Sequence, residues 1–283
     1  MFSMIPIRDV LDLKAPELDR IFVHGNVGRV LIAIGCSWTR GWGWHDDDMD
    51  FRDVTRQDDV KFMTQDSYVG HVAQHIGATG IINMAIPGSN NDMQTRLLVE
   101  CLERNLEQFG KVFVLWGITS HLRWEMWSTI VDKPTMFMLG SKVPDHKEEE
   151  RAWWLKYHFD DDFERQRLSQ KILMTHGYLK NLNVDHLFFP VFTSYNRHNM
   201  LLNNISDNHY FRPDSHRNDM MSLMYLDQGA IPPAEWLSNP YSKEDREIVS
   251  RLQDAGLMSQ LAHPSRQGHN FIGRSLVGYI SRR

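Results

Sequence analysis

Short apolar runs and longer amphipathic stretches alternate along this chain of 283 residues. The segments RVLIAIG (29–35), KVFVLWGITS (111–120) and HLFFPVFTSYN (186–196) are strongly apolar over the length of a strand. Such runs are typical of a parallel sheet that helices cover on both faces. GIINMAIPGSNN (80–91) is a further apolar run that leads into a turn. These four segments predict the strands of a parallel sheet.

Helical periodicity separates the predicted strands. SYVGHVAQHIG (67–77) predicts a short helix that ends at its last glycine, and apolar positions recur at helical spacing from Met93 to Leu106. A polar stretch at about 147–181 and a closing segment around 271–280 are also predicted to be helical. Alternating strands and helices predict an α/β fold, a three-layer α/β/α sandwich with a mostly parallel sheet of about five strands.

Two segments do not follow this alternation. WHDDDMDFRDVTRQDD (44–59) is an acidic loop, and residues 197–245 are rich in Asn, Asp, Pro and Met without clear periodicity. Both are long for connections within a compact domain, and such loops often form lids or binding surfaces. The sequence has no repeat and no linker that would divide it. We therefore predict a single domain over 1–283 with long loops or insertions at about 44–59 and 197–245.

Composition and charge exclude several classes of protein. The formal net charge of -5 leaves no basic surface for nucleic acid, and no apolar run has the roughly 20 residues of a membrane helix. The start, MFSMIPIRDVLDLK, does not read as a signal peptide, so we expect a cytoplasmic protein. Cys36 and Cys101 are too few for a disulfide framework. His71 and His75 have zinc-like spacing without an evident third ligand, so we expect no metal.

Candidate chemistry gathers at one edge of the predicted sheet. In an open parallel sheet, ligands bind outside the carboxyl ends of the strands. Ser37 directly follows the first predicted strand, and the turns PGSNN (87–91) and GITS (117–120) follow two others. The segment AHPSRQGH (262–269) precedes the last helix and can reach the same edge. Acyl transfer needs a nucleophile, a base and hydrogen-bond donors for the oxyanion, and a serine, a histidine and two small turns could supply them.

The same segments resemble a known family. Four of them are similar, in family order, to the sequence blocks of the SGNH (GDSL-type) hydrolases: GCSWTRGWG (35–43), NMAIPGSNN (83–91), VFVLWGITS (112–120) and HPSRQGHNFIG (263–273). The resemblance extends over nearly the whole chain. It implies a flavodoxin-like sheet and ester hydrolysis through an acyl-enzyme on Ser37, with His263 as the base. It also implies an oxyanion hole formed by Ser37, Gly88 and Thr119, and it implies no cofactor.

Three positions depart from the family pattern. Cys36 replaces the usual aspartate before the serine, and Thr119 stands where the family has its oxyanion asparagine. Gln260 stands where the family has an aspartate three residues before the histidine. Gln260 can orient an imidazole but lacks a carboxylate's charge, and Asp254 is the nearest upstream acid. A dyad with a backbone carbonyl or Gln260 behind His263, a triad with another acid, and lost catalysis all stay open.

The sequence thus predicts a serine esterase that acts on a short acyl group, such as an acetyl group on a carbohydrate. Nine tryptophans would suit a sugar ligand. One alternative is a catalytically inactive binding or structural protein in a larger assembly such as a virion, and another is an acyltransferase. In a working dyad, we expect Ser37 and His263 to lie about 2.6–3.2 Å apart. Activity should be modest, and it should fall as the imidazole is protonated near the ordinary histidine pKa of about 6.5.

Overall fold

A mixed five-stranded sheet organises the computed structural model. The structure describes residues 5–13, 21–41, 57–128, 133–138, 145–191, 201–212, 219–229, 243–260 and 262–283. The strands lie in the order β1-β3-β2-β4-β7, where β1 is Phe22–Gly25, β2 is Arg29–Ile34, β3 is Gly80–Asn83, β4 is Lys111–Ile118 and β7 is Asp185–Pro190. β1 is antiparallel to β3, and the other neighbours are parallel. Taken in chain order, the parallel strands follow the 2-1-3-4 order of flavodoxin-like sheets.

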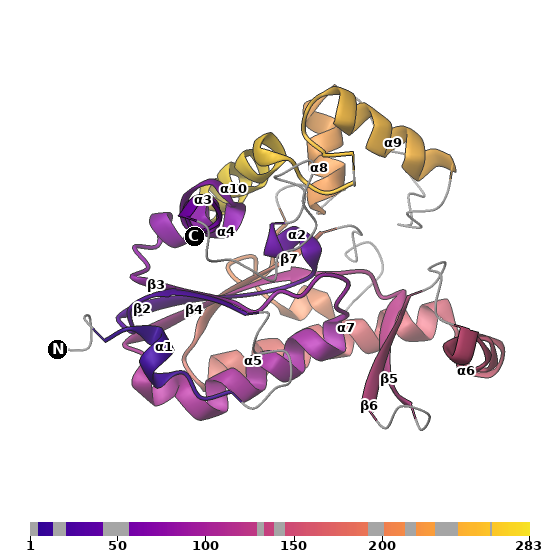
Figure 1. The fold of residues 1–283 in the computed structure, drawn as a ribbon, viewed down its shortest axis with the longest axis horizontal. Helices are drawn as coiled ribbons and strands as arrows, with labels where there is room; N and C mark the ends of the chain where they lie inside the picture. The colour runs from indigo at the N-terminus through magenta and orange to yellow at the C-terminus, as the bar shows by residue number, and fades with distance from the viewer. Residues whose placement is uncertain are drawn as a thin grey trace.

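Helices cover both faces of this sheet (Figure 1). One face packs against α4 (Tyr68–His75), α8 (Met220–Asp227) and α10 (Arg266–Ile280), and α9 (Lys243–Asp254) packs on α8. The other packs against α1 (Ile7–Val10), α5 (Asn91–Asn105) and α7 (Asp161–Asn181). Successive side chains of β2 alternate between the two cores, because Leu31 belongs to the first and Ile32 to the second. The predicted three-layer α/β fold is therefore confirmed.

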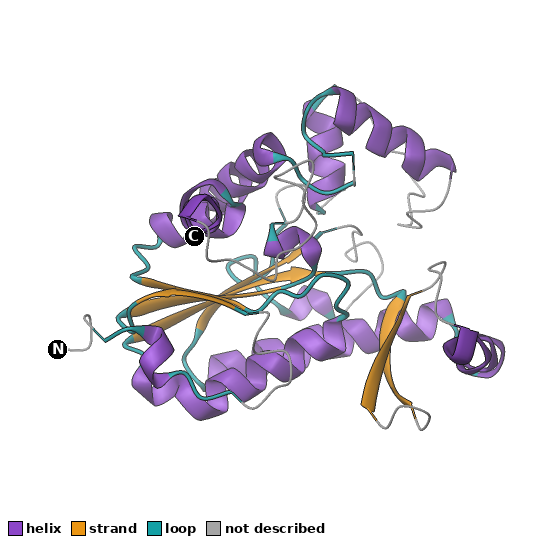
Figure 2. Cartoon of the chain, in the orientation of Figure 1, coloured by secondary structure: helices purple, strands orange, loops and turns teal. Residues whose placement is uncertain are grey.

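Several elements differ from the sequence-based prediction. β1 and the antiparallel hairpin of β5 (Arg123–Ser128) and β6 (Lys133–Met138) were not expected. The predicted helical stretch at 147–181 is two helices, α6 (Asp145–Tyr157) and α7. Trp124 of β5 stacks on Trp154 of α6 at 4.1 Å, so aromatic packing joins the hairpin to that helix. Figure 2 shows the hairpin beside α6, apart from the main sheet.

Short helical segments complete the described elements. They are α2 (Ser37–Arg40), α3 (Gln57–Lys61), the π-helix η3 (Phe62–Asp66) and the 3₁₀ turns η4 (Leu106–Gln108) and η5 (Leu202–Asn204). The segment at 197–245, predicted as a long loop or insertion, contains η5, α8 and the start of α9. Asp219 caps α8 by accepting a hydrogen bond from the Ser222 N–H at 2.8 Å. Most of the predicted acidic loop at 44–59 lies outside the described residues.

Two further observations bear on the predicted class of protein. No helix in the described part of the chain is long and apolar enough to cross a membrane. Among the described residues, no group of three or more His, Cys, Asp or Glu side chains is arranged to hold a metal ion. Cys36 and Cys101 are both buried with free thiols.

Candidate active site

Ser37 is the first residue of α2, at the point where β2 ends. The turn requires glycine at position 35, because a Cβ there would lie 1.9 Å from Thr39 Oγ1. The Tyr68 hydroxyl donates a hydrogen bond to the same Thr39 oxygen at 2.6 Å. α2 ends at Gly41, whose φ of 88° is in the left-handed region that favours glycine. These contacts hold Ser37 at the carboxyl edge of the sheet, where the residue is 5% exposed.

His263 lies in a tight turn before α10. The Ser259 N–H donates to the His263 carbonyl at 2.8 Å, and Ala262 has a left-handed φ of 57°. Gly268, in the first turn of α10, allows the helix to approach the preceding chain, because a Cβ there would lie 2.1 Å from the Leu257 carbonyl oxygen. A non-glycine residue in the left-handed region is uncommon, and such strain is often found at functional sites. The turn orients His263 towards the edge where Ser37 lies.

Ser37 and His263 meet although 226 residues separate them in the sequence. His263 Nε2 lies 2.8 Å from Ser37 Oγ, within hydrogen-bond distance. When the hydroxyl donates, Nε2 is the acceptor and the imidazole proton is on Nδ1. This is the orientation in which an imidazole can remove the proton of a serine nucleophile.

The two other predicted oxyanion residues follow β3 and β4, the two strands that flank β2. Gly88 is exposed in the turn after β3 and has a φ of 77°, whereas Thr119 directly follows β4 and is buried. Asn91, the first residue of α5, joins these two segments. Its Oδ1 accepts from the Thr119 N–H at 3.0 Å, and its Nδ2 donates to the Thr119 carbonyl at 2.9 Å. Sequence reasoning did not single out Asn91.

A buried polar chain fastens the Gly88 turn to the Ser37 turn. The Ser89 hydroxyl donates to the Gly35 carbonyl at 2.8 Å and accepts from Gln94 Nε2 at 3.0 Å. Gln94 Oε1 accepts from the Trp116 indole N–H at 2.7 Å. All four residues are buried, so each bond is costly to break without a replacement. These hydrogen bonds therefore connect the turns after β2 and β3 to β4.

Gln260 and Asp254 were predicted as candidates to orient His263. Gln260 is exposed in the turn that presents His263, and Asp254 is exposed at the last residue of α9. The glutamine that fastens this turn is Gln253, whose Nε2 donates to the Ser259 carbonyl at 2.8 Å. An orienting role for Gln260 or Asp254 therefore stays a prediction.

A second histidine near this edge has a carboxylate partner. His121 Nε2 lies 2.8 Å from Asp161 Oδ1, and Asp161 also accepts from Arg165 at 2.7 Å. Burial lowers the pKa of His121 despite the neighbouring carboxylate. Because Asp161 is the first residue of α7, the pair ties the segment after β4 to that helix.

His269, six residues beyond His263, is fully buried on α10. Its ring stacks on Tyr68 at 5.4 Å and meets Phe62 edge-on at 5.1 Å. Among the described residues, neither ring nitrogen has a hydrogen-bond partner. Burial, with smaller contributions from His263 and His71, lowers the pKa of His269 to about 3. His269 is thus a neutral packing residue behind the site.

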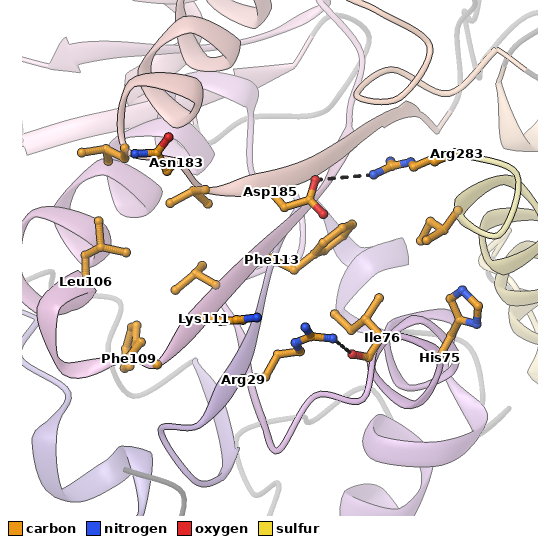
Figure 3. Close-up of a pocket in the computed structure, with 15 residues that line it drawn as sticks. Arg29, His75, Ile76, Leu106, Phe109, Lys111, Phe113, Asn183, Asp185 and Arg283 are labelled. Atoms are coloured by element: carbon orange, nitrogen blue, oxygen red, sulfur yellow. Dashed lines mark hydrogen bonds and ion pairs between the residues drawn. The ribbon is translucent and has the colours of Figure 1, made fainter. Parts of the chain in front are cut away.

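A hollow of about 760 Å³ lies at the opposite edge of the sheet (Figure 3). Its lining includes Arg29, Lys111 and Asp185, the first residues of β2, β4 and β7. The Arg29 guanidinium donates to the Ile76 carbonyl, and Arg283 lies 3.6 Å from Asp185. Ser37 follows the other end of β2, so this hollow is separate from the serine and histidine.

Comparisons with known proteins give limited information about this chain. No family model matches the sequence, and no curated protein matches it. Among solved structures, it is similar to a proposed GDSL-like lipase from Parabacteroides merdae, with 13% identity and a TM-score of 0.35. That alignment covers 90% of this chain and 96% of the other. A similarity of this degree carries no functional argument, so the function is inferred from this chain's own residues.

Proposed function

We propose that this protein is a serine hydrolase that cleaves esters through an acyl-enzyme on Ser37. His263 Nε2 takes the hydroxyl proton as Ser37 Oγ attacks the ester carbonyl. The tetrahedral intermediate then loses the alcohol, which takes that proton from His263. A water molecule, deprotonated by the same imidazole, attacks the acyl-enzyme. The bond from Ser37 Oγ to the acyl carbon then breaks, Oγ takes the proton from His263, and a carboxylic acid is released. The observation that carries the proposal is the 2.8 Å distance between His263 Nε2 and Ser37 Oγ.

The developing oxyanion needs donors that are already in place. We assign this role to the backbone N–H groups of Ser37 and Gly88 and to the Thr119 hydroxyl. The paired hydrogen bonds of Asn91 support the assignment, because they fix the backbone of Thr119 relative to the turn that contains Gly88. Loss of one oxyanion donor typically lowers kcat by about 10²–10³-fold.

The proposed substrates are esters of short acyl groups, including acetyl groups on carbohydrates. This part of the proposal comes from the family resemblance of the four sequence blocks and not from the geometry of the site. An acyltransferase would use the same acyl-enzyme but pass the acyl group to a sugar hydroxyl instead of water. Adding a sugar acceptor and analysing the products separates the two reactions.

Turnover of 4-nitrophenyl acetate tests the proposed nucleophile. Wild type should release 4-nitrophenolate, and Ser37→Ala should lower the rate by at least about 10³-fold. Ser281→Ala, at the exposed end of α10, is a matched control that should keep the wild-type rate. Equal rates in wild type and Ser37→Ala would refute the serine mechanism. An inactive wild type would favour the alternative of a binding or structural protein.

A further inference from the structure

A buried arginine lies next to the proposed nucleophile. Arg40 is the last residue of α2, three positions after Ser37, and it is 3% exposed. Among the described residues, its guanidinium makes one hydrogen bond, a long one of 3.5 Å from Nη1 to the Asn83 carbonyl. Among the residues that the structure describes, no carboxylate forms an ion pair with Arg40.

This arrangement is energetically unusual. A buried charge costs several kcal/mol unless a partner compensates it, and one contact at 3.5 Å to a neutral carbonyl compensates little. Desolvation lowers the pKa of Arg40 to about 10, so the group stays charged at neutral pH. Arginines with partly buried side chains elsewhere do have carboxylate partners: Arg165 with Asp161 (2.7 Å), Arg212 with Asp207 (2.8 Å) and Arg283 with Asp185 (3.6 Å).

Arg40 lies on the same short helix as Ser37, which places its charge at the candidate active site. Residues i and i+3 share one face of a helix, and helical side chains lean towards the N-terminus of the helix. Arg40 therefore lies on the face of α2 that holds Ser37. The Asn83 carbonyl, its contact, lies at the end of β3, five residues before Gly88. The guanidinium is thus at the carboxyl edge of the sheet, on the β3 side of the serine.

We propose that Arg40 binds an anionic group of the substrate, so that the ester attacked by Ser37 bears a carboxylate or phosphate close to its scissile bond. The inference rests on the proposed function, whose substrate class it narrows. A guanidinium presents five N–H donors in a planar fork, and four of its N–H groups make no hydrogen bond to a residue that the structure describes. A carboxylate or phosphate can accept two of these donors at once and supplies the missing counter-charge.

Esters with matched leaving groups test this preference. Mono-4-nitrophenyl glutarate, with a carboxylate on the acyl side, is compared with neutral 4-nitrophenyl acetate. 4-Acetoxyphenyl phosphate, with its charge on the alcohol side, is compared with neutral phenyl acetate. Wild type should have a higher kcat/KM for one of the anionic esters than for its neutral counterpart, 4-nitrophenyl acetate or phenyl acetate. Whichever anionic ester is preferred identifies the side of the ester bond on which the anion lies.

Substitutions of Arg40 then show whether this residue causes the preference. Arg40→Gln should lower kcat/KM for the preferred anionic ester about 10- to 100-fold more than for the neutral one. Arg40→Lys keeps the charge without the fork and should retain part of the preference. Arg104→Gln removes the same charge from the far end of α5 and should leave the preference intact. If Arg40→Gln does not fold, Arg40→Lys provides the test. A smaller ratio of kcat/KM between the anionic and the neutral ester would support the proposal, and an unchanged ratio would contradict it.

Two results would overturn the proposal. Equal losses on anionic and neutral esters in Arg40→Gln would assign the arginine a structural role. Equal kcat/KM values of the wild type for anionic and neutral esters would also overturn it. That result is expected if a carboxylate of this protein neutralises Arg40.

Calorimetry with glutarate and with phenyl phosphate tests the anion site at Arg40 independently of the proposed hydrolysis. Ser37→Ala, which cannot turn over an ester, should bind one of the two anions, and the double variant with Arg40→Gln should bind it at least tenfold more weakly. Absence of binding of both anions to Ser37→Ala would contradict the anion site, whereas binding without ester turnover in wild type would contradict only the hydrolysis.

Discussion

The two ends of α5 use the same hydrogen-bonding device at opposite edges of the sheet. Asn91 begins the helix and pairs with the backbone N–H and carbonyl of Thr119. Asn105 ends the helix and pairs in the same way with Asp12, at 2.7 Å to Oδ1 and 2.8 Å from Nδ2. The device is therefore structural in itself. At Asn91 the same pair of bonds has a place in the proposed function, because Thr119 lies at the edge with Ser37 and His263.

Charge compensation also differs between the two edges. At the amino edge, Arg29 caps the carbonyl end of α4 and Arg283 meets Asp185, although these residues line the hollow in Figure 3. At the carboxyl edge, Arg40 is more deeply buried and has no carboxylate partner among the described residues. The comparison teaches that a buried charge without a carboxylate partner among the described residues, close in sequence to the proposed nucleophile, is a stronger guide to function than the volume of a hollow.

The largest expected effect comes from the base. His263→Ala should lower kcat/KM for 4-nitrophenyl acetate by about 10³–10⁴-fold, because Ser37 Oγ loses its proton acceptor. His75→Ala, at the rim of the hollow, is the matched control and should keep the wild-type value. A loss of less than tenfold in His263→Ala would remove the histidine from the mechanism.

The next largest expected effect is a difference in kcat between substitutions of Asn91 and Asn105. Asn91→Ala should lower kcat about 100-fold with little change in KM, because a displaced Thr119 backbone misplaces an oxyanion donor. Asn105→Ala removes equivalent bonds and should cost similar stability, about 1–3 kcal/mol, without affecting kcat. Steady-state kinetics and urea unfolding of both variants measure the two effects. Similar kcat values for the two variants would show that the Asn91 bonds serve the fold alone.

Buried histidines at the two edges predict a dependence of stability on pH. Burial lowers the pKa values of His186 and His269 to about 3. The unfolded chain binds these protons below about pH 6.5, whereas the folded protein does not. Stability should therefore fall as the pH falls from about 6.5 towards 3, by up to about 1.4 kcal/mol per pH unit for each histidine.

Substitution with phenylalanine distinguishes these two histidines. His186 Nδ1 bonds to the Val184 carbonyl at 2.9 Å and Nε2 to His176 Nδ1 at 2.8 Å, so His186→Phe should destabilise the protein at pH 7. His269 makes no such bonds, and His269→Phe should raise stability by about 1 kcal/mol at pH 7. Both variants should show a weaker pH dependence in urea unfolding. A destabilised His269→Phe protein would indicate a hydrogen-bond partner for that ring.

The smallest effect is expected at the hollow. Lys111 is exposed at the start of β4, so Lys111→Ala should change the free energy of unfolding by no more than about 0.5 kcal/mol. Ester turnover should also stay at the wild-type rate. A tenfold loss of turnover would mean that the amino edge takes part in the function.

The parallel strands could be predicted because burial on both faces demands continuous apolar runs. β1 was missed because it has only four residues and pairs antiparallel at the edge of the sheet. The hairpin of β5 and β6 was missed because stacking of Trp124 on Trp154 joins it to a helix that follows later in the sequence. Contacts of this kind leave no periodic signal in the sequence.

The site could be predicted in part. The family resemblance named Ser37 and His263, and the structure brings them within hydrogen-bond distance, while their catalytic roles stay a prediction. Asn91 and Arg40 could not be singled out from the sequence. The role of an asparagine depends on which backbone faces it, and an arginine in a polar turn is ordinarily exposed. Only the three-dimensional structure reveals the burial of Arg40 and the bonds of Asn91.

Covalent labelling with a fluorophosphonate tests the central claim most directly, because this reagent reacts with a serine only when a base activates it. Peptide mapping of the labelled wild-type protein should find the phosphonyl group on Ser37. His263→Ala and heat-denatured wild type should remain unlabelled. Absence of labelling in the folded wild type, or a label on another serine, would contradict the assignment of Ser37 as a nucleophile activated by His263.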